Sequence, residues 1–457
     1  MDRQLESDSL LPREKEKTAT TLLAVSIASF LSVSFGFNLL FFNPFTLKNN
    51  QWHYSSHILF GIAASIGSLF SGICIDKIGR KSTILMISTI YFFGYVVLIF
   101  GSPKLQNSAD FANLFTFFGC FYCGIGFGMT SLAVPVYVAE VSSPRLRGTM
   151  GAITHYAIVL GIFVYYLTAD ANNENINYYF FALIGLVLVL FNILIICMPE
   201  SPRWLLADNQ RDKAFKNQFW LLGIKSEAED ECNQIEINLA HQHTASINDF
   251  RSPGLFRPLL IGSTLLFINH LTIIEYIFYL FYRDFKNRND IKACVILQLI
   301  LSLCGCFIVH KISRRGLLLF GSTVLFIWSI CFYVYYLSQR KVDVKTRVAY
   351  FFIYDIIFTF TWGPLPWIIV SEIFPPRARG LLGGILRSLI WLVIIPLETM
   401  FKLPYFASYV NFLCITVIVF FLSIFFIYYY VPETKNLSLE EIEHYYTMNR
   451  GFRNYLF

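Results

Sequence analysis

Charged side chains are scarce in this chain. Asp, Glu, Lys and Arg make up only 14% of its 457 residues, whereas a soluble domain carries roughly 25%. Hydrophobic residues make up 56%, the mean hydropathy is +0.55, and apolar runs of about 20 residues recur from end to end. The composition therefore predicts an all-α, polytopic membrane protein and excludes an ordinary soluble domain.

Several other signals are missing. Most of the ten cysteines lie inside apolar runs without zinc-type spacing, so we expect neither a disulfide framework nor a metal site. The net charge of +6 is small for this length, which argues for the lipid bilayer and against nucleic acid as a partner. Residues 1–19 lack the apolar core of a signal peptide and predict a disordered cytosolic tail.

The apolar runs fall into six, a polar insert, and six. We expect spans at 20–42, 58–75, 82–101, 112–139, 150–169, 178–198, 257–282, 291–309, 316–337, 347–373, 380–401 and 405–430. The predicted domains are the tail 1–19, a six-helix half 20–198, a cytosolic linker 199–256, a second half 257–431 and a cytosolic tail 432–457. Basic residues between the first spans indicate that both termini are cytosolic, while the second half follows that rule less well.

The linker is the only sizeable polar piece. Trp204–Leu222 and Ser226–His241 predict amphipathic helices, and nothing in them suggests catalysis.

Two prolines interrupt the tenth run. Each proline removes an amide donor, so Pro364 and Pro366 predict a broken helix that neighbouring groups must satisfy. Trp367 follows the break, where its indole suits stacking on the apolar face of a sugar ring. The alternative is an ordinary kinked helix with an interfacial tryptophan.

Short motifs recur between the predicted spans. They are Gly72–Lys81, the glycines from Gly119 to Gly128, Pro135–Gly148, Pro199–Trp204, Trp362–Gly380, and Pro432–Lys435 followed by Leu439–Ile442. Together and in this order they resemble the signatures of the sugar porter family, the hexose-transporter branch of the major facilitator superfamily.

The resemblance implies twelve transmembrane helices in two halves that move a hexose or related polyhydroxylated solute by alternating access. It implies no enzymatic activity and no cofactor. It also implies that charged residues close an inner gate, and we expect them to be Asp76, Arg80, Glu140, Arg147, Glu200, Arg203, Arg314, Glu372, Arg379 and Glu433.

Some positions depart from the family pattern. Cys120 replaces an arginine of the fourth helix, and His310 and Ser313 replace an aspartate and a glycine of the second loop motif. Asn38 stands where proton-coupled members carry aspartate, which favours facilitated diffusion.

The substrate site departs most. Registering the motifs places the family's sugar-binding positions on His155, Asn269, His270, Glu275, Gln298 and Trp367, with Ile390 at an asparagine position. Neutral amides read sugar hydroxyls well because they both donate and accept. Histidine and glutamate in their place change what the pocket can recognise.

Two alternatives stay open. The first is a transporter of a charged or modified solute with proton linkage, in which His270 and Glu275 titrate as a coupled pair. Arg387 is the weaker partner for Glu275, and we expect its long stem to reach the inner mouth instead. The second is a non-transporting sensor or scaffold subunit derived from a sugar transporter, favoured by four departures from the family pattern: Cys120, His310, Ser313 and Ile390.

The N-terminal tail contains a candidate sorting signal. Glu6, Leu10 and Leu11 match the acidic dileucine pattern, which resembles the tails of intracellularly retained hexose transporters. We therefore expect a clathrin adaptor as partner, and residence in the plasma membrane or in endosomal and lysosomal membranes.

Overall fold

The computed structural model describes most of the chain. The described residues are 18–41, 51–101, 109–168, 178–240, 253–272, 288–309, 311–339, 342–375, 378–402 and 409–447. Every structural statement below concerns these ranges, so Glu6, Leu10, Leu11, Glu275 and His310 lie outside the described residues.

The first half of the chain forms six apolar helices. They are α2 (Thr18–Phe41), α3 (Gln51–Ile78), α4 (Arg80–Phe100), α5 (Ala109–Val141), α6 (Arg147–Thr168) and α7 (Tyr178–Phe191), which continues as the 3₁₀ helix η1 (Asn192–Cys197). These helices match the predicted spans to within a few residues, except at α3, which begins earlier.

The second half repeats the pattern. Its helices are α11 (Pro253–Leu271), α13 (Arg288–Ile308), α14 (Arg314–Ser338), the pair α15 (Val344–Phe360) and α16 (Leu365–Ile373), α17 (Arg379–Lys402) and α18 (Tyr409–Tyr430). Ten stretches of the described chain are long and apolar enough to cross a membrane, and α7 with η1 and α13 supply two shorter ones. The predicted all-α membrane fold is confirmed.

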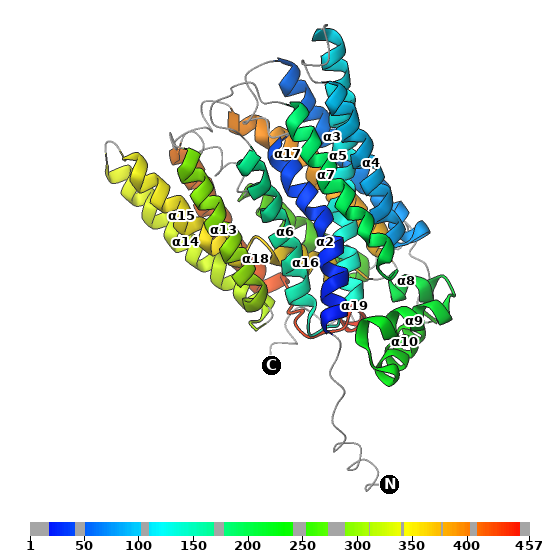
Figure 1. The fold of residues 1–457 in the computed structure, drawn as a ribbon. Coiled ribbons are helices and arrows are strands. Elements are labelled where there is room, and N and C mark those ends of the chain that lie inside the picture. The colour runs from blue at the N-terminus through cyan, green and yellow to red at the C-terminus, as the bar shows by residue number, and fades with distance from the viewer. Residues whose placement is uncertain are drawn as a thin grey trace.

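Polar helices gather at one end of the bundle, which we call the linker end. The linker forms α8 (Pro202–Ala207), α9 (Arg211–Leu222) and α10 (Lys225–Ala240), and α19 (Leu439–Thr447) follows the last span. Figure 1 shows these helices together at the end where α2 begins. The hydroxyl of Thr20 donates to the Leu221 carbonyl at 3.0 Å, which ties α2 to α9.

The two sets of six helices meet along α3 with α17 and along α6 with α13. Small residues allow the first contact: the hydroxyl oxygens of Ser65 and Ser388 lie 2.6 Å apart, and Gly72 lies against the backbone of Gly380. A β-carbon at Gly72 would overlap the Gly380 carbonyl. Small side chains therefore let the backbones of the two halves approach closely.

The predicted break in the tenth span is confirmed. Residues 361–364 form a turn between α15 and α16, and Pro364 immediately precedes α16. The side-chain amide of Asn269 donates to the Trp362 carbonyl at 2.7 Å, and the Trp362 indole donates to Ser322 at 3.1 Å. Neighbouring helices thus satisfy polar groups at the break, as the membrane requires.

Two glutamates that follow the sixth and twelfth spans cap helices far away in sequence. Glu200 accepts the backbone N–H groups of Arg80 at 3.0 Å and of Lys81 at 3.1 Å, at the start of α4. Glu433 accepts those of Arg314 and Arg315, both at 3.1 Å, at the start of α14. The same device therefore occurs once in each half.

The cap on α4 also explains one glycine. Gly79 precedes α4 with a φ of 91°, in the region that disfavours side chains, and a β-carbon there would lie 2.5 Å from a Glu200 carboxylate oxygen. Burial raises the pKa of Glu200, and hydrogen bonds from the backbone of Ser201 and Lys81 oppose that shift.

The Glu200 cap predicts a loss of stability on truncation. Glu200→Ala leaves the first amides of α4 without their acceptor, so we expect a loss of about 1–2 kcal/mol and a lower melting temperature in detergent. Glu229→Ala is the matched control because Glu229 is exposed on α10. Equal melting temperatures for Glu200→Ala and wild type would show that the cap contributes nothing.

Candidate functional site

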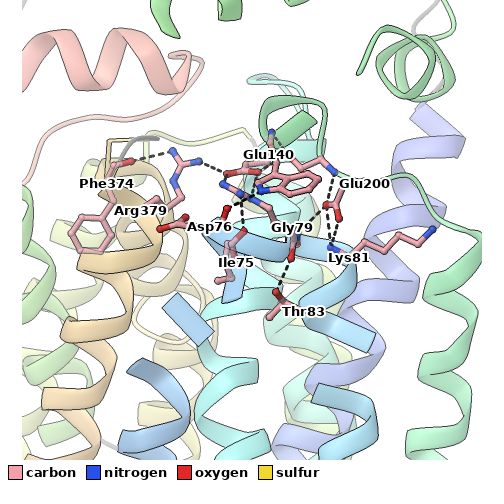
Figure 2. Close-up of polar contacts among 12 residues, drawn as sticks. Ile75, Asp76, Gly79, Lys81, Thr83, Glu140, Glu200, Phe374 and Arg379 are labelled. Carbon is pink, nitrogen blue, oxygen red and sulfur yellow. Dashed lines mark hydrogen bonds and ion pairs between the residues drawn. The ribbon is translucent and has the colours of Figure 1, made fainter. Parts of the chain in front are cut away.

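A buried ion network joins the two halves at the linker end, and Glu140 on α5 is its centre. Arg80 contacts both Glu140 oxygens, at 2.7 and 2.8 Å, and the Ser201 hydroxyl donates to the same carboxylate at 2.5 Å. Arg379 at the start of α17 donates to Glu140 at 3.0 Å from the other half (Figure 2). The side chains of Glu140 and Arg379 are only 1% and 0% exposed.

The second half contains the equivalent pair. Arg314 at the start of α14 forms an ion pair with Glu372 on α16, and both side chains are buried. Arg314 also donates to the Thr434 carbonyl at 3.3 Å, beside the Glu433 cap. Arg80 with Glu140 and Arg314 with Glu372 thus occupy corresponding places in the two halves.

Other predicted gate residues also cross between halves at this end. The carboxylate of Asp76 lies against the backbone of Gly380 in the first turn of α17, where a helix N-terminus favours negative charge. Arg147 donates to the Ala139 carbonyl and, across the halves, to the Leu437 carbonyl, each at 3.1 Å. All ten predicted gate residues lie at the linker end.

Arg203 sits within this cluster of cations. Burial lowers the pKa of Arg203 to about 9, and the nearby guanidinium groups of Arg147 and Arg379 act in the same direction. Glu140 opposes the shift. The network therefore holds several cations close together, and Glu140 partly balances their charge at Arg203.

Two cavities lie between the halves, above the ion network. The linker-side cavity holds about 580 Å³ of empty space between α2, α5, α6 and α16, and its wall includes Arg147 and Ser371. The central cavity holds about 790 Å³ of empty space, part of it open to solvent, and its wall includes Leu40 and Ile394. Phe35, His155, Ile158 and Trp367 line both cavities.

Five of the six predicted substrate residues come together at the central cavity. His155, Asn269, His270, Gln298 and Trp367 all line it. Glu275, the sixth, lies outside the described residues, so its pairing with His270 stays a prediction.

The polar atoms of this wall are partly occupied. Asn269 bonds the helix break, and His270 Nδ1 lies 2.7 Å from the Leu266 carbonyl. Gln298 donates to Asp355 on α15 at 3.1 Å. Within the described chain, Gln298 Oε1 and His155 Nε2 are buried without a partner, so both can bond a solute hydroxyl.

Asp355 and Trp391, two residues near this wall, escaped the sequence analysis, and a third, Arg387, lies elsewhere than expected. Asp355 orients Gln298, and Trp391 lines the central cavity, with its ring centroid 5.6 Å from that of His270. The guanidinium carbon of Arg387 lies 4.4 Å from the Trp367 ring centroid, and Arg387 is 2% exposed. The expectation that Arg387 reaches the inner mouth was wrong, because its guanidinium packs on the indole instead. Ionisable residues within the apolar runs were the available signal.

Known proteins resemble this chain along nearly its whole length. It is 26% identical over 450 residues to the facilitated trehalose transporter Tret1 of Bombyx mori, covering 93% of this chain and 86% of that protein. It is 25% identical over 416 residues to mouse solute carrier family 2, facilitated glucose transporter member 8, covering 83% and 82%.

Solved structures share the fold. The proton:xylose symporter XylE bound to 6-bromo-6-deoxy-D-glucose superposes with a TM-score of 0.80 at 20% identity, covering 94% of this chain and 100% of that one. The inward-open conformation of XylE from E. coli gives 0.66 at 21% identity, covering 93% and 98%. The family model described as "Sugar (and other) transporter" matches residues 24–446, and the chain therefore belongs to this family of multi-pass membrane transporters, which are not enzymes.

Proposed function

We propose that this protein moves a hexose or a related polyhydroxylated solute across a membrane by alternating access. The observation that carries the proposal is a cavity between the two halves whose wall combines an indole, an amide and imidazoles, closed at one end by an ion network. Two of the similar proteins are facilitated transporters of trehalose and of glucose, and this supports a sugar-like solute.

Each cavity residue receives a role from its contacts. The free Gln298 Oε1 accepts a solute hydroxyl, and His155 Nε2 bonds a second one. Trp367 offers a flat apolar surface for the ring. His270 and Asn269 shape the wall, because the side chains of both residues bond to backbone carbonyls.

The gate works through the linker-end network. The Arg379–Glu140 ion pair joins the two halves while this end is closed, and it must separate before a solute can leave through this end. Loops and termini at the linker end are then cytosolic.

Transport is facilitative in this proposal. The Asn38 side chain donates to Tyr95 at 2.7 Å and to the Ser34 carbonyl at 2.8 Å, so a neutral amide fills the place of the proton-coupled aspartate. The second candidate, a charged or modified solute, is favoured by the position of Arg387 beside the cavity wall.

Uptake by purified protein in liposomes tests the function and the role of Trp367. Wild type should take up labelled hexose, whereas Trp367→Leu should reduce uptake about tenfold or more, because a stacking surface worth about 1 kcal/mol and part of the cavity wall are lost.

A control variant separates binding from folding. Trp220→Leu changes a half-buried tryptophan of the linker, outside both cavities, and should leave uptake near wild type. A well-folded Trp367→Leu protein with unchanged uptake would remove Trp367 from the site. Wild type that inserts correctly but takes up no solute would favour the scaffold hypothesis.

The gate predicts a conformational shift in Arg379→Gln. Removing one partner of a buried ion pair costs about 3–5 kcal/mol, so the closed linker end should lose most of its population. Hydrogen exchange should become faster at the end of α5 and in the first turns of α17.

The matched control for the gate is Arg211→Gln. Arg211 pairs with Glu236 at 3.1 Å, but the two side chains are 55% and 34% exposed, and such surface pairs contribute little. Unaltered exchange in Arg379→Gln would mean that this contact does not hold the halves together.

The N-terminal tail predicts the subcellular localisation of the protein. We propose that Glu6, Leu10 and Leu11 bind a clathrin adaptor and direct the protein to endosomal or lysosomal membranes. Changing Leu10 and Leu11 together to Ala should move a fluorescently tagged protein to the cell surface. The idea fails if the unmodified protein already resides at the surface.

A further inference from the structure

Arg387 is a buried cation without an acidic partner in the described chain. Its Nε and Nη1 atoms are fully buried and donate no hydrogen bond within the described chain, and only 2% of the residue is exposed. The other deeply buried arginines of this end of the bundle are bonded: Arg80 and Arg379 to Glu140, and Arg314 to Glu372. Arg387 therefore stands apart from the gate network.

The guanidinium lies directly behind a side chain, Trp367, that lines both cavities. Its carbon is 4.4 Å from the Trp367 ring centroid, and it is close enough to His270 to interact electrostatically. Trp367 lines both cavities and His270 lines the central one. Arg387 is thus separated from the cavity space by no more than the side chains that a solute would touch.

The stacking contact does not compensate for burying the charge. A cation–π contact is worth about 0.5–2 kcal/mol, whereas removing an ion from water costs several kcal/mol even after the protein relaxes. Arginine cannot lose its proton to avoid this cost. An anion that reaches the guanidinium would therefore be bound strongly.

Resting on the proposed function, we infer that the preferred solute is a polyhydroxylated ring that carries one carboxylate, and that Arg387 recognises it. The guanidinium leaves the face of Trp367 to form a two-pronged bond with the carboxylate, and the solute ring takes its place on the indole. The planar fork of arginine fits a carboxylate in this way.

Charge counting favours a carboxylate over a phosphate. Among the described wall residues of the two cavities, the one arginine is Arg147, which is bonded to the Ala139 and Leu437 carbonyls. A single available guanidinium balances one negative charge but leaves a dianionic phosphate half compensated. Asp355 accepts a hydrogen bond from Gln298, a residue of this wall.

Calorimetric titration of purified wild type with glucose, glucuronate and glucose 6-phosphate tests the inference. Glucuronate should bind at least about tenfold more tightly than glucose, since one charge-assisted bond contributes about 1.5–3 kcal/mol. Arg387→Gln keeps a polar side chain but removes the charge, so the two affinities should become equal or reverse. Arg387→Lys should keep part of the preference.

Lys345→Gln is the matched control, because it removes one positive charge from an exposed position at the start of α15. Its preference for glucuronate should equal that of wild type. An Arg387→Gln protein that still prefers glucuronate, or a wild type that binds glucose as tightly as glucuronate, would overturn the inference. A preference for glucose 6-phosphate would overturn the carboxylate assignment.

Failure of this inference is distinguishable from failure of the proposed function. Liposomes that take up glucose, combined with equal binding of glucose and glucuronate, leave the transport proposal intact and remove the role of Arg387. Liposomes that take up neither solute remove the transport proposal, while titration still decides which solute the cavity prefers.

Discussion

The closed linker end depends on one carboxylate, Glu140. It lies in the membrane-spanning part of the fold, where an unpaired charge is expensive, and it satisfies its oxygens with Arg80, Ser201 and, from the other half, Arg379. Because the same group joins three segments, its geometry can be completed only when the halves are together. When this end opens, the side chains of Arg379 and Glu140 must separate and become hydrated. A network of this kind favours two discrete arrangements over a continuous range.

Each half repeats the same construction with different cross-contacts. In each half an arginine at a helix start pairs with a glutamate on a later helix, and a second, distant glutamate caps the same helix start. These three residues are Arg80, Glu140 and Glu200 in the first half. In the second half they are Arg314, Glu372 and Glu433. Glu140 also accepts a donor from the opposite half, whereas Glu372 Oε1 is buried without a partner in the described chain. The repeat thus builds two similar clamps, and only the first reaches across the interface through a direct ion pair.

The sequence predicts the parts of this fold that depend on composition and on local chemistry. Apolar runs predict the spans, and Pro364 predicts the break before α16. The motifs bring five of six proposed substrate residues to one cavity. The sequence does not predict contacts that depend on how each helix is rotated against its neighbours. Asp355 meets Gln298 from 57 residues away, and Arg387 turns toward Trp367 instead of the mouth. Neither contact has a local signature.

The central cavity therefore combines a neutral surface with charges placed one side chain behind it. Gln298 presents its free carbonyl oxygen to the cavity because its amide nitrogen is bonded to Asp355, so the acid sets which end of the amide a solute meets. Arg387 makes a different contact, because its guanidinium cation lies on the aromatic ring of Trp367, which forms part of the wall. In this wall Asp355 lies behind the Gln298 amide, and Arg387 lies on the Trp367 indole. Because charged groups lie directly behind the neutral surface, the wall can distinguish a charged solute from a neutral one.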